Sequence, residues 1–373
     1  AGAVDGNLSD ARFNQPSALA MDADGNIYVS DSGNHSIRRI STNGFVTTVA
    51  GDWRSGGYRD GFGSAANFHG PGSLALATDG SLFIADTILR QMTTDGSVTT
   101  PNVRTTVSAL TLDRSGNLYV ADSYAIRRVN LDNSTSLIAG AEPSTGGDDG
   151  DRKTARFYSP TGIAAGANGS VYVADQSNNA IRRVARDGTV ITIAGKTVQG
   201  QFEYPGASDG VGTEARFRGP TGVALDQDGN IYVADKGNHK IRKISPSGVV
   251  STLAGTGLVG SDDGPGSIAS FNNPTGIAVD PDGVVYVADQ GNDRVRKITR
   301  DGMVSTITAL TRVPDNYHLD GPTSLAVDAE RDIYVAHWHA NLIRKLTPNG
   351  IVTNIALGPI GSSDGPEASG HFN

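Results

Sequence analysis

The chain has 373 residues, 48 of them glycine and none cysteine, and its formal net charge is −8. A chain without cysteine has no disulfide framework, no thiolate metal site and no cysteine nucleophile. The acidic balance argues against a nucleic-acid partner, which normally faces a basic surface. No apolar stretch reaches the roughly 20 residues that a membrane-spanning helix needs, so we expect no membrane insertion.

The N-terminal residues contain the unit from which the rest of the chain is built. A connector running from Asp5-Gly6 to Phe13 comes first, and short apolar runs follow at residues 19–22, 25–31, 37–40 and 46–51. The runs are rich in β-branched residues and are bounded by Gly, Asp, Asn and Pro, which is typical of strands. Apolar residues stand on both sides of the second run, as a sheet covered on both faces requires. The unit therefore predicts four strands.

The same unit recurs along the chain, and its second strand is recognisable in seven copies. The copies span approximately residues 5–51, 60–100, 103–140, 149–195, 209–255, 263–310 and 315–358, and residues 359–373 form a closing or truncated connector. Repeats of four strands predict one all-β domain over residues 1–373, a closed β-propeller of four-stranded antiparallel blades. Seven blades is the plain interpretation. Six blades is the alternative, because the second and third copies are shortened.

The connector has its own pattern: Asp-Gly, four residues, then Ala-x-Phe. It recurs from Asp60, Asp149, Asp209 and Asp263, and a last copy runs from Asp364 to Phe372 with glycine in place of alanine. This last copy suggests two arrangements. Either it docks where the last blade meets the first, or it leads into another blade of a longer protein.

Residues 217–244 carry the most regular copy. They read Phe-x-x-Pro-Thr-Gly-Val-Ala and then Gly-Asn-Ile-Tyr-Val-Ala-Asp-x-Gly-Asn-His-x-Ile-Arg-Lys-Ile. This pattern resembles an NHL repeat, and the resemblance covers essentially the whole chain. It implies the propeller fold but no single function, since NHL propellers include RNA-binding modules, cell-surface interaction domains, sensor domains and a peptide-amidating lyase.

Two residues recur in nearly every copy. An aspartate ends the second strand in six copies, and an arginine stands in the third strand in all seven. A residue present in every blade usually builds the blade. We therefore interpret Asp31 with Arg38, and Asp235 with Arg242, as buried partners within one blade.

Three turns between the first and second strands read Asp-x-Asp-Gly, and they begin at Asp22, Asp226 and Asp280. The pattern resembles the start of a calcium loop, but the later bidentate glutamate is missing. Asx turns between two strands explain the same residues. The turn is therefore the better interpretation, with calcium as the alternative.

Antiparallel strands place the second-to-third loops and the connectors at one end of the ring, which we call the upper face. All seven histidines and both tryptophans then lie there, and ligand sites commonly gather at such a mouth. His35 and His239 stand in regular copies and are interpreted as ordinary repeat residues. Flat aromatic surface with a polar rim suits a glycan, a peptide or a protein, although these aromatics could instead fold onto their own connectors. The ligand-binding candidates are Trp53, Tyr58, Phe202, Tyr204, Trp338 and His69.

The seventh copy departs from the pattern, because His337 replaces the recurrent aspartate. In an extended segment His337 and His339 point the same way. Together with His318 and Asp320 they form a candidate site for zinc or a similar ion. The alternative is a degenerate repeat whose histidines pack locally.

Two functions follow. The leading hypothesis is an extracytoplasmic module, extracellular or periplasmic, whose upper face binds a glycan, peptide or partner protein. The absence of cysteine, the scarcity of lysine relative to arginine and the glycine-rich loops favour that location. The alternative is a metal-assisted lyase or hydrolase on the seventh copy, with Tyr317 as acid or base and Arg344 or Arg312 as an anion clamp.

Overall fold

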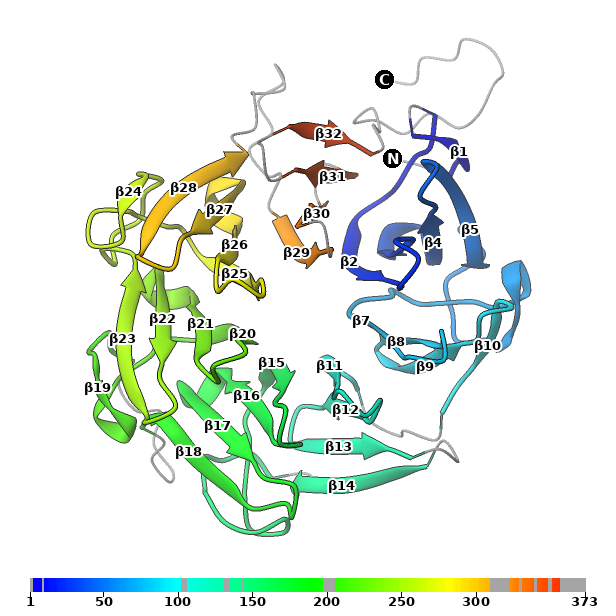
Figure 1. The fold of residues 1–373 in the computed structure, drawn as a ribbon. Coiled ribbons are helices and arrows are strands. Elements are labelled where there is room, and N and C mark those ends of the chain that lie inside the picture. Colours follow the sequence, from blue (N-terminus) through cyan, green and yellow to red (C-terminus); the bar gives the residue numbers. More distant parts are fainter. Residues whose placement is uncertain are drawn as a thin grey trace, which may run out of the picture.

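The computed structural model describes residues 3–8, 10–101, 106–130, 134–141, 144–196, 205–308, 322–328, 331–338, 341–347 and 351–355. Within these ranges the chain forms seven separate antiparallel sheets arranged around a common centre (Figure 1). The all-β propeller and its seven blades are confirmed, and the six-blade alternative is wrong. The part of the chain described here contains no helix long and apolar enough to cross a membrane.

In each blade four consecutive strands are ordered from the centre outward, and in blades 1, 2, 5 and 6 a short strand that precedes them in the chain is added at the outer edge (Figure 1). Blade 1 contains β1 (Gly6–Asn7), β2 (Pro16–Met21), β3 (Ile27–Asp31), β4 (Ser36–Ile40) and β5 (Phe45–Gly51). Blade 2 contains β6 (Gly61–Phe62), β7 (Leu74–Leu76), β8 (Leu82–Asp86), β9 (Ile88–Met92) and β10 (Ser97–Thr99). Blade 3 contains β11 (Ala109–Leu112), β12 (Leu118–Ala121), β13 (Ala125–Val129) and β14 (Thr135–Gly140).

The remaining four blades repeat this order. Blade 4 contains β15 (Pro160–Ala165), β16 (Val171–Asp175), β17 (Ala180–Val184) and β18 (Val190–Gly195). Blade 5 contains β19 (Gly210–Val211), β20 (Pro220–Leu225), β21 (Ile231–Asp235), β22 (Lys240–Ile244) and β23 (Val249–Ala254). Blade 6 contains β24 (Gly264–Pro265), β25 (Pro274–Val279), β26 (Val285–Asp289), β27 (Arg294–Ile298) and β28 (Met303–Thr308). Blade 7 contains β29 (Pro322–Val327), β30 (Ile333–His337), β31 (Leu342–Leu346) and β32 (Val352–Asn354).

Short 3₁₀ turns lie in the second-to-third loops and in the connectors. They are η1 (Ser32–Asn34), η2 (Gly63–Ala65), η3 (Gln176–Asn178), η4 (Gly212–Glu214), η5 (Lys236–Asn238) and η6 (Gln290–Asn292).

The connectors do not lie wholly on the upper face, which corrects the expectation from the sequence. The connector of blade 2 leaves the upper end of β5 and adds β6 to the outer edge of the blade, where Gly61 pairs with Val98. The N–H of Gly63 then donates to the carbonyl of Gly96, in the lower turn of the same blade. The chain finally returns to the upper end before β7. Blades 1, 5 and 6 gain a fifth strand in the same way, so the sheets have four or five strands rather than four throughout.

The apolar core lies between neighbouring blades. Strand residues such as Val233 pack on the blade before, and the Ala-x-Phe of each connector fills the same space. Phe217 and Ala215 are completely buried there, between blades 4 and 5. Full burial of a large apolar side chain contributes about 1.5–3 kcal/mol, so the connector motif is a wedge that holds two blades together.

Among the described residues, blade 7 meets blade 1 through side chains, and no sheet contains strands of both blades. Tyr334 and Ile343 of blade 7 belong to the same core cluster as Phe13 of blade 1. The N–H of Gln15 donates to the side-chain oxygen of Asn341 at 2.7 Å. The last connector copy, residues 364–372, lies outside the described residues.

Candidate functional site

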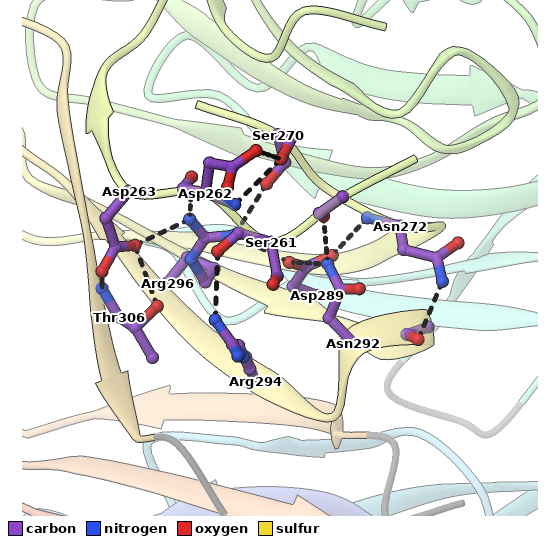
Figure 2. A network of polar contacts seen from close by, with 12 residues as sticks. Ser261, Asp262, Asp263, Ser270, Asn272, Asp289, Asn292, Arg294, Arg296 and Thr306 are labelled. Carbon is purple, nitrogen blue, oxygen red and sulfur yellow. Dashed lines mark hydrogen bonds and ion pairs between the residues drawn. The ribbon is translucent and has the colours of Figure 1, made fainter. Parts of the chain in front are cut away.

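A buried arginine with two carboxylate partners stands at the upper, outer part of blade 6 (Figure 2). Arg296 is fully buried and donates to Asp289 at 2.9 Å and to Asp263 at 2.8 Å. The same two terminal nitrogens also donate to the backbone carbonyls of Ser270 and Asp262. Charge-assisted hydrogen bonds between a guanidinium and a carboxylate are among the strongest in proteins.

The same arrangement recurs in five blades, which confirms the predicted pairing of the recurrent aspartate with the recurrent arginine. The other four sets are Arg38 with Asp31 and Asp5, Arg90 with Asp86 and Asp60, Arg182 with Asp175 and Asp149, and Arg242 with Asp235 and Asp209. The second carboxylate comes from the Asp-Gly of the connector, a role that the sequence analysis missed. The connector phenylalanine lies under the guanidinium, as Phe271 does under Arg296 at 4.9 Å.

The two carboxylates of a set differ in electrostatics. In blade 6 burial raises the pKa of Asp289, although hydrogen bonds from Asn272 and Asn292 and the Arg296 guanidinium oppose that shift. For Asp263 burial acts in the same direction, but hydrogen bonds from Thr306 and the contact with Arg296 lower its pKa overall. Perturbed carboxylates often mark catalytic sites, yet here they repeat in every regular blade and hold the connector to the sheet.

Blades 3 and 7 depart from this arrangement. In blade 3 the arginine follows the aspartate by five residues, against seven in blades 1, 4, 5 and 6 and four in blade 2. Arg127 contacts Asp122 through Nε at 3.0 Å. In blade 7 His337 occupies the aspartate position at the end of β30 and is fully buried. Arg344, the predicted anion clamp, donates from Nε to the side chain of Asn354 at 3.0 Å.

The structure does not test the predicted metal site. Within the described ranges, no group of three or more His, Asp or Glu side chains is arranged to hold a metal ion. His337 is placed, but its proposed companions are not. Outside the described residues lie Arg312, Tyr317, His318, Asp320 and His339. The metal-assisted enzyme therefore stays a prediction.

The Asp-x-Asp-Gly segments are turns, as predicted. Asp22 accepts the N–H of Asp24 at 3.0 Å and that of Asn26 at 2.8 Å, and its other oxygen accepts the Asn26 side chain. Asp226 and Asp280 accept equivalent backbone N–H groups within their own turns. These carboxylates are the local acceptors that shape the turn.

The upper face at the junction of blades 1 and 2 carries exposed aromatic side chains. Trp53 and Tyr58 are 48% and 44% exposed. The Tyr58 ring stacks on the His69 ring, with centroids 5.5 Å apart, and the Arg54 guanidinium lies 5.0 Å from the Trp53 ring. The structure thus brings together two of the predicted ligand-binding residues, Tyr58 and His69. Trp338 is half-buried just beyond β30, and Phe202 and Tyr204 lie outside the described residues.

Hydrogen bonds hold this aromatic segment at several points. The N–H of Gly57 donates to the Phe68 carbonyl at 3.0 Å, and the Asn67 side chain donates to the Ser55 carbonyl at 2.6 Å. His35 Nδ1 donates to the carbonyl of His69 at 2.7 Å. The aromatic residues are therefore displayed on a braced loop.

His35 and His239 are repeat residues, as predicted, and they have a shared task. Both have left-handed backbone conformation, with φ near 50°, and both side chains reach the connector of the next blade. His239 Nδ1 accepts the N–H of Asn273 at 3.0 Å, and burial lowers the pKa of this histidine. Asparagine at the same position in other blades also accepts a backbone N–H from the connector of the next blade. Asn179 accepts the N–H of Gly219, and Asn341 accepts that of Gln15.

Two hollows lie on the lower face, which is the end of the ring opposite the upper face on which we expected a ligand site. The first, of about 350 Å³, lies between blades 3 and 4 and is lined by the turns around residues 113–117 and 166–169. The second, of about 460 Å³, is lined by first-to-second turns of blades 3 to 6. Neither hollow could be predicted from the sequence, because each combines turns from separate repeats.

Comparison with known families decides the relationship. The family described as NHL repeat matches residues 13–40, 217–244 and 271–298, and the Teneurin NHL domain matches residues 44–210. The chain belongs to the NHL-repeat β-propeller family. The predicted resemblance is confirmed.

Similar proteins are much longer than this NHL propeller. The chloroplastic protein SUPPRESSOR OF QUENCHING 1 of Arabidopsis thaliana is 31% identical over 80% of this chain and 26% of its own length. Mouse Teneurin-4 is 28% identical over 80% of this chain and 12% of its own length. Human NHL repeat-containing protein 2 is 29% identical, over 86% and 43% respectively. The chain thus spans less than half the length of each of these relatives.

Solved structures share the fold at low identity. A streptogramin B lyase superposes with a TM-score of 0.65 at 14% identity, covering 94% of this chain and 97% of that one. An auxiliary nutrient binding protein from Bacteroides thetaiotaomicron gives a TM-score of 0.57 at 19% identity, covering 82% and 72%. At such identities the likeness shows the fold alone.

Proposed function

We propose that this NHL propeller is an interaction module that binds a protein partner through its upper face at the junction of blades 1 and 2. The observation that carries the proposal is the exposed pair Trp53 and Tyr58 on a braced loop. Tryptophan, tyrosine and arginine dominate binding hot spots, and here Arg54 lies beside Trp53. A loop that is already held in place loses little entropy when it binds.

The proposal favours a protein or peptide over a glycan. A sugar ring stacks on an open aromatic face, but Tyr58 is already stacked on His69 and Trp53 already has a cation beside it. These arrangements suit an extended chain with apolar and acidic side chains. A glycan ligand remains an outcome that the experiment distinguishes.

The proposal also includes an extracytoplasmic location. It rests on the cysteine-free, lysine-poor composition. Fractionation of the source cells, with an antibody against this chain, tests it. Recovery of the protein in the cytoplasmic fraction alone would overturn this part of the proposal.

We also propose that the ring is closed at the junction of blades 7 and 1 by packing rather than by a shared strand. The common core cluster of the two blades and the Gln15–Asn341 hydrogen bond support closure. A closed ring fixes the relative position of the upper loops, which a binding face needs.

Selection of a phage-displayed peptide library on the immobilised chain tests the binding proposal. We expect selected peptides to lose at least tenfold in affinity for Trp53→Ala and for Tyr58→Ala. Phe62→Ala is the matched control, because Phe62 is an exposed aromatic of the same connector, 64% exposed, but lies on the outer edge in β6. Equal binding to all three variants would refute the site. Saturable binding on a glycan array, with no peptide selected, would replace the protein partner by a glycan.

A further inference from the structure

The hollow between blades 3 and 4 on the lower face is rich in positive charge. Its volume is about 350 Å³, and three arginines line it: Arg114 from the β11–β12 turn, Arg128 from β13 and Arg186 from the β17–β18 turn. Asp113 is the one acidic residue in its lining. The hollow therefore has an excess of two positive charges in a chain whose net charge is −8.

The single carboxylate is occupied by its own turn. Asp113 accepts the N–H groups of Ser115 and Asn117, both at 2.9 Å, and the Asn117 side chain at 2.8 Å. The hydroxyl of Tyr119 donates to the same carboxylate at 3.3 Å. Its oxygens are thus already committed to four donors.

The three arginines have no carboxylate partner among the residues that the structure describes, because none of them forms an ion pair there. Arg128 makes one long hydrogen bond, of 3.3 Å, to Asn130. Burial and Asp113 raise the pKa of the Tyr119 hydroxyl, while Arg128 and Arg186 act against that shift. Both guanidinium groups therefore lie close enough to the Tyr119 hydroxyl to influence it.

The equivalent junction between blades 5 and 6 shows how such a charge is normally neutralised. Arg300 has the same place in the lower turn of blade 6 as Arg186 has in blade 4, and it donates to Asp228 at 2.8 Å. The position of Asp228 in its turn corresponds to Ser115 in blade 3. Blade 3 has thus replaced the neutralising carboxylate by serine and has added Arg114 next to it.

We propose that this hollow binds a small molecule through an oxyanion group, a phosphate or a carboxylate, held by Arg114 and Arg186. The planar guanidinium fork matches both groups, and a partly enclosed site weakens screening by solvent. The volume lies within the range of small-molecule sites, about 300–1,000 Å³. Asn168 and the Tyr119 hydroxyl also line the hollow and supply polar contacts for orientation. The site is on the face opposite to the proposed protein-binding loop and is independent of it.

Calorimetric titration with inorganic phosphate and with citrate, at low ionic strength, tests the proposal on the full chain. We expect saturable binding of at least one probe with one site per chain, weakening as salt is added. Binding of phosphate but not citrate would assign a phosphate group, and the reverse would assign a carboxylate. No saturable binding of either probe would overturn the proposal.

Variants locate the site. The double variant Arg114→Ala/Arg186→Ala should lose at least tenfold in affinity. Ser115→Asp should lose as much while keeping every arginine, because it recreates the ion pair that Asp228 makes with Arg300. Aspartate stands at this turn position in other blades, so the variant keeps its fold, which circular dichroism checks. Arg300→Ala is the matched control and should bind as the unmodified chain does. The site would be refuted if Ser115→Asp bound the probe as tightly as the unmodified chain does, or if Arg300→Ala lost as much affinity as the double variant.

Discussion

Replacing the buried arginine of blade 6 tests whether the repeated ion network holds the propeller together. In Arg296→Ala four donated contacts are lost, two to carboxylates and two to backbone carbonyls. Asp263 is 47% exposed and can be rehydrated, but Asp289 is fully buried. Breaking a buried pair from one side costs about 3–5 kcal/mol. We expect the lower part of that range, because Asp289 keeps hydrogen bonds from Asn272 and Asn292.

The assay is urea unfolding followed by fluorescence and circular dichroism. Arg294→Ala is the matched control: it lies two residues earlier in β27, is half-buried and donates one bond, to the Ser261 carbonyl at 3.0 Å (Figure 2). Its loss should cost about 1 kcal/mol. If Arg296→Ala loses no more than Arg294→Ala, the network does not carry the stability assigned to it.

The same variant has a pH signature. Burial already raises the pKa of Asp289, and removal of the cation raises it further. Because the protonated carboxyl is easier to bury than the carboxylate, the destabilisation by Arg296→Ala should be smaller at pH 5 than at pH 7.5. Equal destabilisation at both pH values would show that the buried carboxylate is not the source of the cost.

Three further predictions follow. Burial raises the pKa of Asp31 and of Asp175 from the ordinary aspartate value of 3.8 to about 6 in the folded chain. Protonation of these carboxyls therefore favours the folded state. This contribution to the free energy of unfolding is complete below pH 3.8 and is lost as the pH rises through 6. For each of the two aspartates, the free energy of unfolding should fall by about 1 kcal/mol as the pH rises from 5 to 7, measured by urea unfolding. Asp31→Asn should abolish the part of this pH dependence that comes from Asp31. Asn341→Ala should speed hydrogen exchange at the amide of Gln15 and cost about 1 kcal/mol, whereas unchanged exchange would contradict the contact between blades 7 and 1. Asp226→Ala should cost about 1–2 kcal/mol in the same unfolding assay, because the N–H and side chain of Asn230 and the hydroxyl of Tyr232 lose their acceptor. A neutral result would argue against the Asx turn.

The blades and the aspartate–arginine pairing were readable from the sequence because both follow from local spacing that repeats. The connector aspartate was missed as a second partner, because it stands 30 to 33 residues before its arginine and no local spacing links the two.

The lower hollows could not be predicted in the same way. Arg114 and Arg186 belong to different repeats, and each is an ordinary turn residue in its own copy. Their approach depends on the angle between adjacent blades, which no pattern within one repeat encodes. The upper aromatic loop was found because Trp53 and Tyr58 are rare residue types in one short segment.

The self-contained ion network has a consequence for how such chains grow. In blade 5 both charged partners of Arg242, Asp209 and Asp235, lie in one continuous stretch with the Phe217 ring and the Arg216 carbonyl. The other carbonyl that Arg242 contacts belongs to Ser208, the residue directly before this stretch. A recombination event that copies DNA from one Asp-Gly to the next therefore duplicates a complete set of charged partners. No buried charge is left without its partner. The boundary at which a repeat can be added or deleted lies at the start of the connector, and not between the visible sheets.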